Sequence, residues 1–210
     1  MVILKVNIKN KRIISVIVDP FNITNTNRTN DEKEAFLLFC VCVAGKKATM
    51  ISEKLANFLS LDSSVSSPFQ KVRNMIAENS LTENLKKVKM GKYSLIENAF
   101  TIIVNSSLNL NTVTPEELET VPGVGKKTSR FFILHSRENA NVAVIDTHIL
   151  KYLNSIGVDA GKSVPTGKRY DELEQIMLSE SKKMNMSPAD FDFKIWSWYA
   201  SKKTGHPIFK

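Results

Sequence analysis

The sequence predicts a mainly α-helical protein, a two-lobed bundle of about eight to ten short helices. After residue 30, apolar residues recur at a spacing of three and four positions, as in Leu55, Phe58 and Leu59. Three helix starts carry a hydroxyl residue followed by proline. The alternation of period two that is typical of strands is confined to the first 18 residues.

The first part of the chain predicts a small N-terminal β-hairpin. Apolar residues alternate with other residues on both sides of Asn10 and Lys11: Leu4, Val6 and Ile8, then Ile14, Val16 and Val18. Residues 19–30 are polar and predict a loop. We therefore expect residues 1–30 to form the hairpin and loop, and residues 31–210 to form the helical domain. The stretch 60–68 has the composition of a linker and could separate two lobes, with a cleft between them.

Three helices begin with the same local pattern. Ser67, Thr114 and Ser187 each precede a proline, which suits the first helical position. Gln70 and Glu117 follow as the partners of a capping box, and Asp190 places an acid at the positive end of the helix dipole.

The charge of the chain favours an anionic partner. Its formal net charge is +8 and its pI is about 9.4. Nucleic acid is the first candidate, and a basic protein without a polyanion partner is the alternative. No apolar run reaches the length of a membrane span, and the N-terminus lacks a secretory signal. We expect a monomer in the cytoplasm (nucleoid) or the nucleus.

The two cysteines predict neither a metal site nor a cofactor. Cys40 and Cys42 are two positions apart in an apolar run, and this spacing makes neither a zinc site nor an iron–sulfur site. Two buried free thiols are the expected arrangement.

The stretch "TVPGVGKKTS" joins two predicted helices. Gly123 and Gly125 allow a tight turn and close approaches that a side chain would block, and Val124 is an apolar plug. The amides at the start of the second helix can hold a phosphate without reading bases. An ordinary α-hairpin is the alternative. The adjacent Lys126 and Lys127, in a basic protein, favour DNA binding, with Lys126 as a phosphate contact.

Lys127 and Asp146 are the candidate catalytic residues. An unprotonated lysine amine in the first helical turn is a nucleophile, and its attack on C1′ of a sugar gives a Schiff base. Asp146 precedes "THILKYL", a predicted helix, and would cap it. A carboxylate held in this way is a fixed anion that can also stabilise a sugar cation.

The segments "LETVPGVGKKTS" and "VAVIDTHIL" resemble the helix-hairpin-helix–Gly/Pro–Asp superfamily of DNA glycosylases, typified by endonuclease III. The likeness runs over residues 31–200 and includes "MGKYSLIENAF". It implies Lys127 as nucleophile and Asp146 as catalytic acid. The implied DNA-backbone contacts are Gly123, Val124, Gly125, Lys126 and Thr128. The iron–sulfur cluster of endonuclease III is absent, since no cysteine follows Cys42.

The end of the chain is similar to the second class of 8-oxoguanine DNA glycosylases. Asp192, Ile195 and Trp196 match a D-x-x-I-W segment, and Thr204 and Gly205 match the start of a terminal T-G-K-x-x-K. The spacing between the two is longer here, and the tail reads "GHPIFK". The resemblance implies a bifunctional glycosylase and abasic-site lyase acting on double-stranded DNA, with 8-oxoguanine as the base.

Aromatic residues and the terminal lysine are the candidates for a base pocket: Trp196, Trp198, Tyr199, Phe209 and Lys210. Phe191, Ile195 and Trp198 are predicted to share the core-facing side of a helix. Trp196 and Tyr199 are predicted on another side, where one could stack on an extruded base. Two alternatives remain: a glycosylase for an oxidised pyrimidine, and a helix-hairpin-helix module that binds DNA without catalysis.

Overall fold

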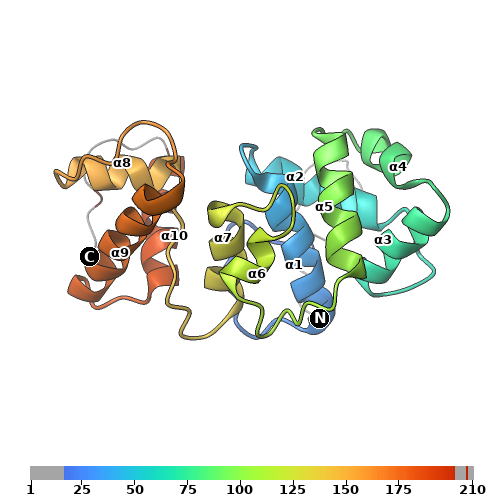
Figure 1. Ribbon diagram of the computed structural model, residues 1–210, viewed down its shortest axis with the longest axis horizontal. Coiled ribbons are helices and arrows are strands. Elements are labelled where there is room, and N and C mark those ends of the chain that lie inside the picture. The colour runs from blue at the N-terminus through green and yellow to red at the C-terminus, as the bar shows by residue number, and fades with distance from the viewer. Residues whose placement is uncertain (1–16, 202–206, 208–210) are drawn as a thin grey trace, which may run out of the picture. The chain divides into compact units, whose positions relative to one another are not determined.

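The computed structural model describes residues 17–201 and residue 207, and these form ten α-helices and no β-strand (Figure 1). In chain order they are α1 (Asn30–Val43), α2 (Ala48–Leu59), α3 (Pro68–Ala77), α4 (Leu81–Lys87), α5 (Tyr93–Asn105), α6 (Pro115–Glu119), α7 (Lys126–Ser136), α8 (Thr147–Ser155), α9 (Gly167–Lys183) and α10 (Pro188–Ala200). The predicted mainly α-helical fold is confirmed. Residues 1–16, which hold most of the predicted hairpin, lie outside the described residues.

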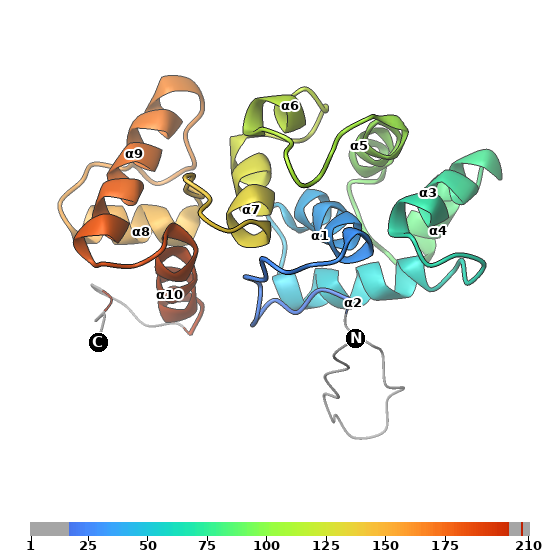
Figure 2. The ribbon, with the colours of Figure 1, turned by 90° about the horizontal axis from the view of Figure 1, so that it is seen from below.

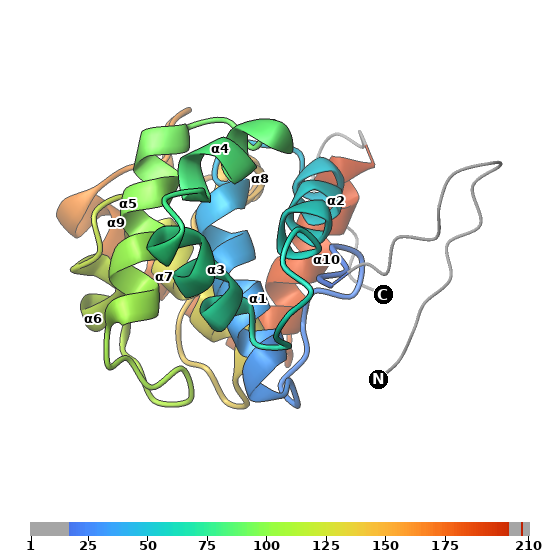
Figure 3. The ribbon, with the colours of Figure 1, turned by 90° about the vertical axis from the view of Figure 1, so that its right-hand side faces the viewer.

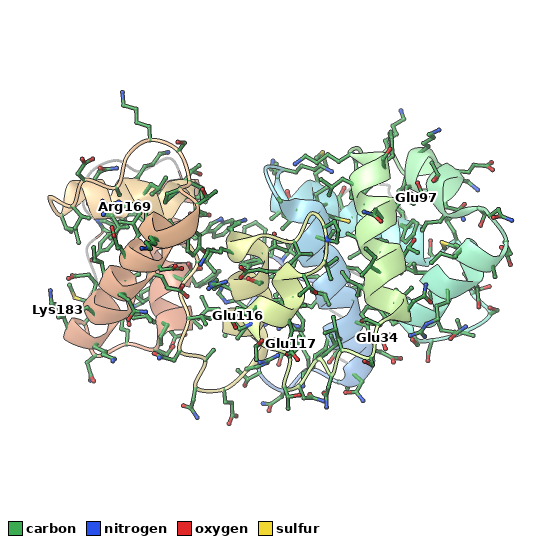
Figure 4. The ribbon with its side chains drawn as sticks, viewed as in Figure 1. Glu34, Glu97, Glu116, Glu117, Arg169 and Lys183 are labelled. Atoms are coloured by element: carbon green, nitrogen blue, oxygen red, sulfur yellow. The ribbon has the colours of Figure 1, made fainter. Side chains whose placement is uncertain are left out.

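The predicted caps of α6 and α10 are formed. Thr114 accepts the amide hydrogen of Glu117 at 3.2 Å, and the Glu117 carboxylate accepts the amide hydrogen of Thr114 at 2.7 Å. This reciprocal pair is a complete capping box, and Glu117 lies in the first turn of α6 (Figure 4). At α10, Ser187 accepts the amide hydrogen of Asp190 at 3.1 Å. These contacts span three residues, which is why the local sequence predicts them.

The capping box predicted at α3 is only half formed. Ser67 accepts the amide hydrogen of Gln70 at 3.1 Å, as expected. The Gln70 side chain does not return the bond but donates to Asn74 at 3.0 Å. Glu34 of α1 takes over instead: its carboxylate accepts from the Ser67 hydroxyl at 2.7 Å and from the Phe69 amide at 3.0 Å (Figure 4). A residue 33 positions earlier in the chain therefore completes this cap.

The chain divides into two compact units. Unit 1 holds α1 to α6, with described residues 17–23 and 27–124. Unit 2 holds α7 to α10 together with residues 24–26. The boundary between Val124 and Gly125 falls inside the predicted hairpin turn.

Helix α1 is the centre of unit 1 and packs against α2, α3 and α5 (Figures 2 and 3). All nine residues from Ala35 to Val43 are buried, so the helix is apolar around its whole circumference. Phe58 of α2 and Phe100 of α5 meet with ring centroids 6.1 Å apart. None of the helices in the described part of the chain is long and apolar enough to cross a membrane.

The stretch 60–68 does not separate two lobes, which corrects the prediction made from its composition. It lies inside unit 1, between α2 and α3. Asp62 accepts hydrogen bonds from the Ser64 amide at 2.8 Å and from the Asn74 side chain at 2.8 Å. Lys71 donates to the Leu59 carbonyl at 2.9 Å. Polar side chains of α3 therefore hydrogen-bond to this stretch, which is an ordered connection within unit 1 and not a linker between lobes.

Both cysteines are buried free thiols, as predicted. They lie in α1, where burial raises the pKa of Cys42 to about 12. A thiol with such a pKa stays protonated at neutral pH and is inert as a nucleophile.

Unit 2 is built around α10, which packs against α7, α8 and α9 (Figure 1). Its core contains Tyr152, Tyr170, Phe191 and Ile195 among its fully buried side chains. The loop predicted between residues 19 and 30 contributes residues 24–26 to this unit. The Asn25 amide donates to the carbonyl of His135, at the end of α7, at 3.1 Å. The loop is therefore attached to the helix that carries the candidate nucleophile.

Candidate active site

The two glycines of the turn between α6 and α7 differ in backbone conformation and in surroundings. Gly123 has φ +91°, and a Cβ atom there would come within 3.0 Å of Leu95 Cδ2. Gly125 has an extended backbone with φ −103°, and no atom lies within 4 Å of a Cβ built on it. Val124, between them, is buried, and its amide donates to the Val121 carbonyl at 2.9 Å. The backbone requires Gly123, whereas Gly125 leaves open space at the start of α7.

The first turn of α7 exposes a positive helix end. The Gly125 carbonyl accepts the amide hydrogens of Thr128 at 2.9 Å and Ser129 at 3.1 Å, and no side chain caps the helix. An uncapped helix start can bind an anion. Thr128 itself is only 6% exposed. Its side chain is buried and its amide is bonded within the turn, and the backbone contact through Thr128 stays a prediction.

The two adjacent lysines have different surroundings. Lys126 forms an ion pair with Asp171 of α9, which the sequence did not predict. The Lys127 ammonium lies 5.3 Å from the centroid of the Phe131 ring, one turn further along α7. Both lysines are partly exposed. Lys126 therefore belongs to a pair that neutralises it, while Lys127 is held against an aromatic face.

Asp146 caps α8, as predicted. Its Oδ1 accepts the amide hydrogens of His148 at 2.8 Å and Ile149 at 3.0 Å. Within the described part of the chain, Oδ2 accepts no hydrogen bond. One oxygen thus orients the carboxylate, and the second keeps its lone pairs available for a cation.

A chain of polar side chains runs from Thr24 through the buried His135 to Asp192 of α10. Thr24 Oγ1 lies 2.8 Å from Nδ1 of His135, and Nε2 of His135 lies 3.2 Å from Asp192 Oδ2. Burial raises the pKa of Asp192, and the hydrogen bond from His135 opposes this shift. The Asp146 carboxylate raises the pKa of Asp192 further, whereas the Lys127 ammonium lowers it. Lys127 and Asp146, nineteen positions apart in the sequence, therefore both act on one buried carboxyl.

Helix α9 supplies a second group of residues that sequence reasoning missed. Tyr170 accepts the amide hydrogen of Ile145 at 3.0 Å. Glu174 accepts the amide hydrogen of Ala143 at 3.0 Å and a hydrogen bond from Arg130 Nε at 3.2 Å. One local feature of the sequence could have indicated this role. Glu174 is a charged residue at a core-facing position, because Tyr170, Leu173, Glu174 and Met177 follow a helical repeat.

One aromatic candidate of α10, Tyr199, does not lie where the helical spacing predicted. Tyr199 is in the core together with Phe191 and Ile195, so its assignment to another face is wrong. It stacks on His148 with ring centroids 6.2 Å apart and planes at 14°. A repeat of four residues, 191, 195 and 199, places all three on one side of the helix.

The two tryptophans remain at the edge of unit 2. Trp198 is partly buried and packs against the core, as predicted. Trp196 stacks on Phe193, with centroids 6.1 Å apart and planes at 18°. Phe209 and Lys210, the remaining base-pocket candidates, lie outside the described residues. The role of these aromatic residues in base binding stays a prediction.

Comparison with known proteins identifies similar sequences. A model of the 8-oxoguanine DNA glycosylase family matches residues 16–186. Endonuclease III of Buchnera aphidicola subsp. Baizongia pistaciae is 31% identical over 84 residues, which are 40% of this chain and 33% of that protein. Endonuclease III of Buchnera aphidicola subsp. Schizaphis graminum is 44% identical over 48 residues, which are 23% of this chain and 22% of that protein. The matches thus span about a third or less of these curated relatives.

Two solved structures share the fold. A crystal structure of the Methanocaldococcus jannaschii 8-oxoguanine glycosylase/lyase, in complex with a 15mer DNA containing 8-oxoguanine, has a TM-score of 0.65 at 21% identity. That match covers 93% of this chain and 94% of the other. The 8-oxoguanine DNA glycosylase of Thermotoga maritima has a TM-score of 0.61 at 20% identity, with 88% and 87% covered. At these identities the likeness concerns the fold.

Proposed function

The chain belongs to the 8-oxoguanine DNA glycosylase family, and on this premise we propose that it is a bifunctional DNA glycosylase and abasic-site lyase for 8-oxoguanine. One observation carries the catalytic part of this proposal. Lys127 lies in the first turn of α7, whose start no side chain caps, and Asp146 is oriented by the two amide hydrogens that its Oδ1 accepts at the start of α8. An amine at an open helix start and a carboxylate in a fixed orientation are the nucleophile and the anion that this reaction needs.

The proposed reaction begins when the damaged nucleotide is flipped out of double-stranded DNA. The unprotonated amine of Lys127 forms a bond to C1′ while the bond between C1′ and the base breaks, and the departing base takes up a proton. Asp146 stabilises the positive charge that develops on the sugar. Opening of the sugar ring gives an iminium ion. Loss of a C2′ proton then expels the 3′ phosphate and cuts the strand.

The helix-hairpin-helix turn is proposed to hold the DNA backbone. Gly125 leaves open space beside the uncapped start of α7, so a phosphate can approach the amides there. The net charge of +8 favours binding to the same polyanion and makes its affinity dependent on salt. An enzyme with this substrate acts in the nucleoid or the nucleus.

Borohydride trapping tests this function directly. The protein is incubated with one duplex that contains 8-oxoguanine and one that contains an abasic site, and a Schiff base is reduced to a stable covalent adduct. We expect adducts with both duplexes and strand cleavage 3′ to the lesion. A duplex with an oxidised pyrimidine should react much more slowly. Trapping of the pyrimidine and abasic duplexes, but not of the 8-oxoguanine duplex, would point to the pyrimidine-specific alternative, and binding without trapping would identify a non-catalytic DNA-binding module.

A further inference from the structure

The segment that carries Asp146 depends on side chains for its hydrogen bonds. Residues 141–146 form no helix or strand, yet Ala143 and Ile145 are buried, at 4% and 0% exposure. Buried amide groups need hydrogen-bond acceptors. No strand in the described part of the chain can supply them. The Ile145 amide donates to the hydroxyl of Tyr170, and the Ala143 amide donates to the carboxylate of Glu174. Both acceptors belong to one helix, α9.

The same two side chains also contact α7. The second carboxylate oxygen of Glu174 accepts from Arg130 Nε at 3.2 Å, and both side chains of this ion pair are less than 10% exposed. The Arg130 guanidinium lies 5.6 Å from the ring centroid of Tyr170. Arg130 follows Lys127 by three residues, which is one turn of α7.

We propose that Tyr170 and Glu174 are positioning residues that hold the Asp146 carboxylate in a fixed position relative to the Lys127 amine. Tyr170 holds the residue directly before Asp146, and Glu174 connects the same segment to the helix of Lys127. They are four positions apart and therefore share one face of α9. This inference rests on the function proposed above, because it requires that Lys127 and Asp146 act together.

Tyr170→Phe removes one oxygen atom and keeps the ring in the core. Without the hydroxyl, the Ile145 amide loses its acceptor, and the Asp146 segment is free to shift. Misplacement of a catalytic group by about 1 Å can lower the reaction rate by ~10²-fold. We expect single-turnover excision of 8-oxoguanine to fall by ~10-fold or more. Trapping at a preformed abasic site, which has no base to expel, should change by less than about 3-fold.

Tyr152→Phe is the matched control. Tyr152 is also fully buried in the core of unit 2, and its hydroxyl interacts with the Glu180 carboxylate of α9. It should leave excision and trapping close to those of the wild type. Both variants are compared at a temperature where circular dichroism shows each of them folded.

A double variant separates positioning from general stability. If Tyr170 acts through Asp146, then Tyr170→Phe should have little further effect on excision in a chain that already carries Asp146→Asn. Independent losses that multiply would overturn the inference, as would equal behaviour of Tyr170→Phe and Tyr152→Phe. An inactive wild type would instead refute the proposed function itself.

Glu174→Gln tests the second contact. The amide oxygen can still accept from Ala143, but the anion that pairs with Arg130 is lost. We expect a lower melting temperature and the same selective loss of excision. Glu172→Gln is the control, because Glu172 is exposed on α9 and pairs with Arg169 at 2.7 Å, near the start of that helix (Figure 4). Equal effects of the two substitutions on excision would exclude a positioning role for Glu174.

Discussion

The carboxylate of Asp192 lies 3.2 Å from Nε2 of His135, in the interior of unit 2. An ionised carboxylate only accepts hydrogen bonds, so His135 donates through Nε2, and its Nδ1 remains for Thr24. A carboxyl so placed is unfavourable for folding when ionised, because burial is the largest influence on its pKa.

Asp192→Asn should therefore gain relative stability as the pH rises. The folded pKa of Asp192 is raised above its ordinary value of 3.8. The stability that its protonated form contributes is complete below pH 3.8 and is lost as the pH rises through the folded pKa. Asparagine does not titrate. Urea unfolding of both proteins at about pH 4, 5.5 and 7 should therefore show that the free energy of unfolding of the variant rises relative to that of the wild type as the pH rises. A difference that moves in favour of the wild type would contradict the raised pKa.

Lys127→Gln should abolish borohydride trapping and leave duplex binding within a few-fold of the wild type. Glutamine has no amine to form the Schiff base. Lys126→Gln is the control: it should keep trapping and weaken binding modestly, mostly at low salt, because it removes one cation beside the proposed phosphate and leaves the Asp171 carboxylate without its partner. Trapping by Lys127→Gln together with loss of trapping in Lys126→Gln would show that the nucleophile is Lys126.

Asp146→Asn should keep the cap of α8 and remove the negative charge. An asparagine oxygen can still accept from the amides of His148 and Ile149, so the melting temperature should change little. Base excision should fall by ~10² or more, because the carboxylate that stabilises the sugar cation is gone. Single-turnover kinetics and a thermal melt measure the two effects. A large drop in melting temperature with near-normal excision would leave Asp146 with a capping role alone.

The two glycines of the turn should respond differently to alanine. Gly123→Ala is strained by its φ of +91° and by the contact with Leu95, which should cost about 1–3 kcal/mol of stability. Gly125→Ala meets no atom within 4 Å and should fold as well as the wild type. Its added methyl group occupies the space proposed for the phosphate, so its DNA affinity should fall. Unchanged affinity of Gly125→Ala, measured by fluorescence anisotropy, would place the backbone contact elsewhere.

Deletion of Phe209 and Lys210 should lower 8-oxoguanine excision strongly and spare trapping at an abasic site. 8-Oxoguanine has an N7–H donor that guanine lacks, and an acceptor for it would reject guanine at a cost of ~1–3 kcal/mol. The resemblance implies that the end of the chain supplies this acceptor. Single-turnover cleavage of both duplexes is the measurement. Equal losses on the two duplexes would indicate a folding defect, and undiminished excision would remove the tail from base recognition.

Some of the site is local and could be read from the chain. The Asp146 cap and the capping box of Thr114 and Glu117 each connect residues two or three positions apart. The positive φ of Gly123 belongs to a tight turn between two helices. Such contacts need only the backbone geometry of a helix start or a turn, so residue type and spacing are sufficient to predict them.

Other features depended on which helices meet. Glutamine at the third position of α3 looked like a capping-box partner, but Glu34 competes successfully for that role. The serine-rich stretch 60–68 looked like a linker until side chains of α3 were found to bind it. Tyr199 was assigned to the wrong face because Trp198 and Tyr199 both fit a helical repeat, and only the core shows which side of α10 is buried.

By itself, the sequence determined the helical class, most helix starts, and the two candidate catalytic residues with the turn in front of them. Only the tertiary structure decided what holds those residues in place. The contacts of Ile145 with Tyr170, Ala143 with Glu174, His135 with Asp192 and Thr24 with His135 join residues 25, 31, 57 and 111 positions apart. A buried polar group takes its partner from whichever element packs against it, and that choice follows from burying the apolar surface of the whole unit, not from the residues next to it in the chain.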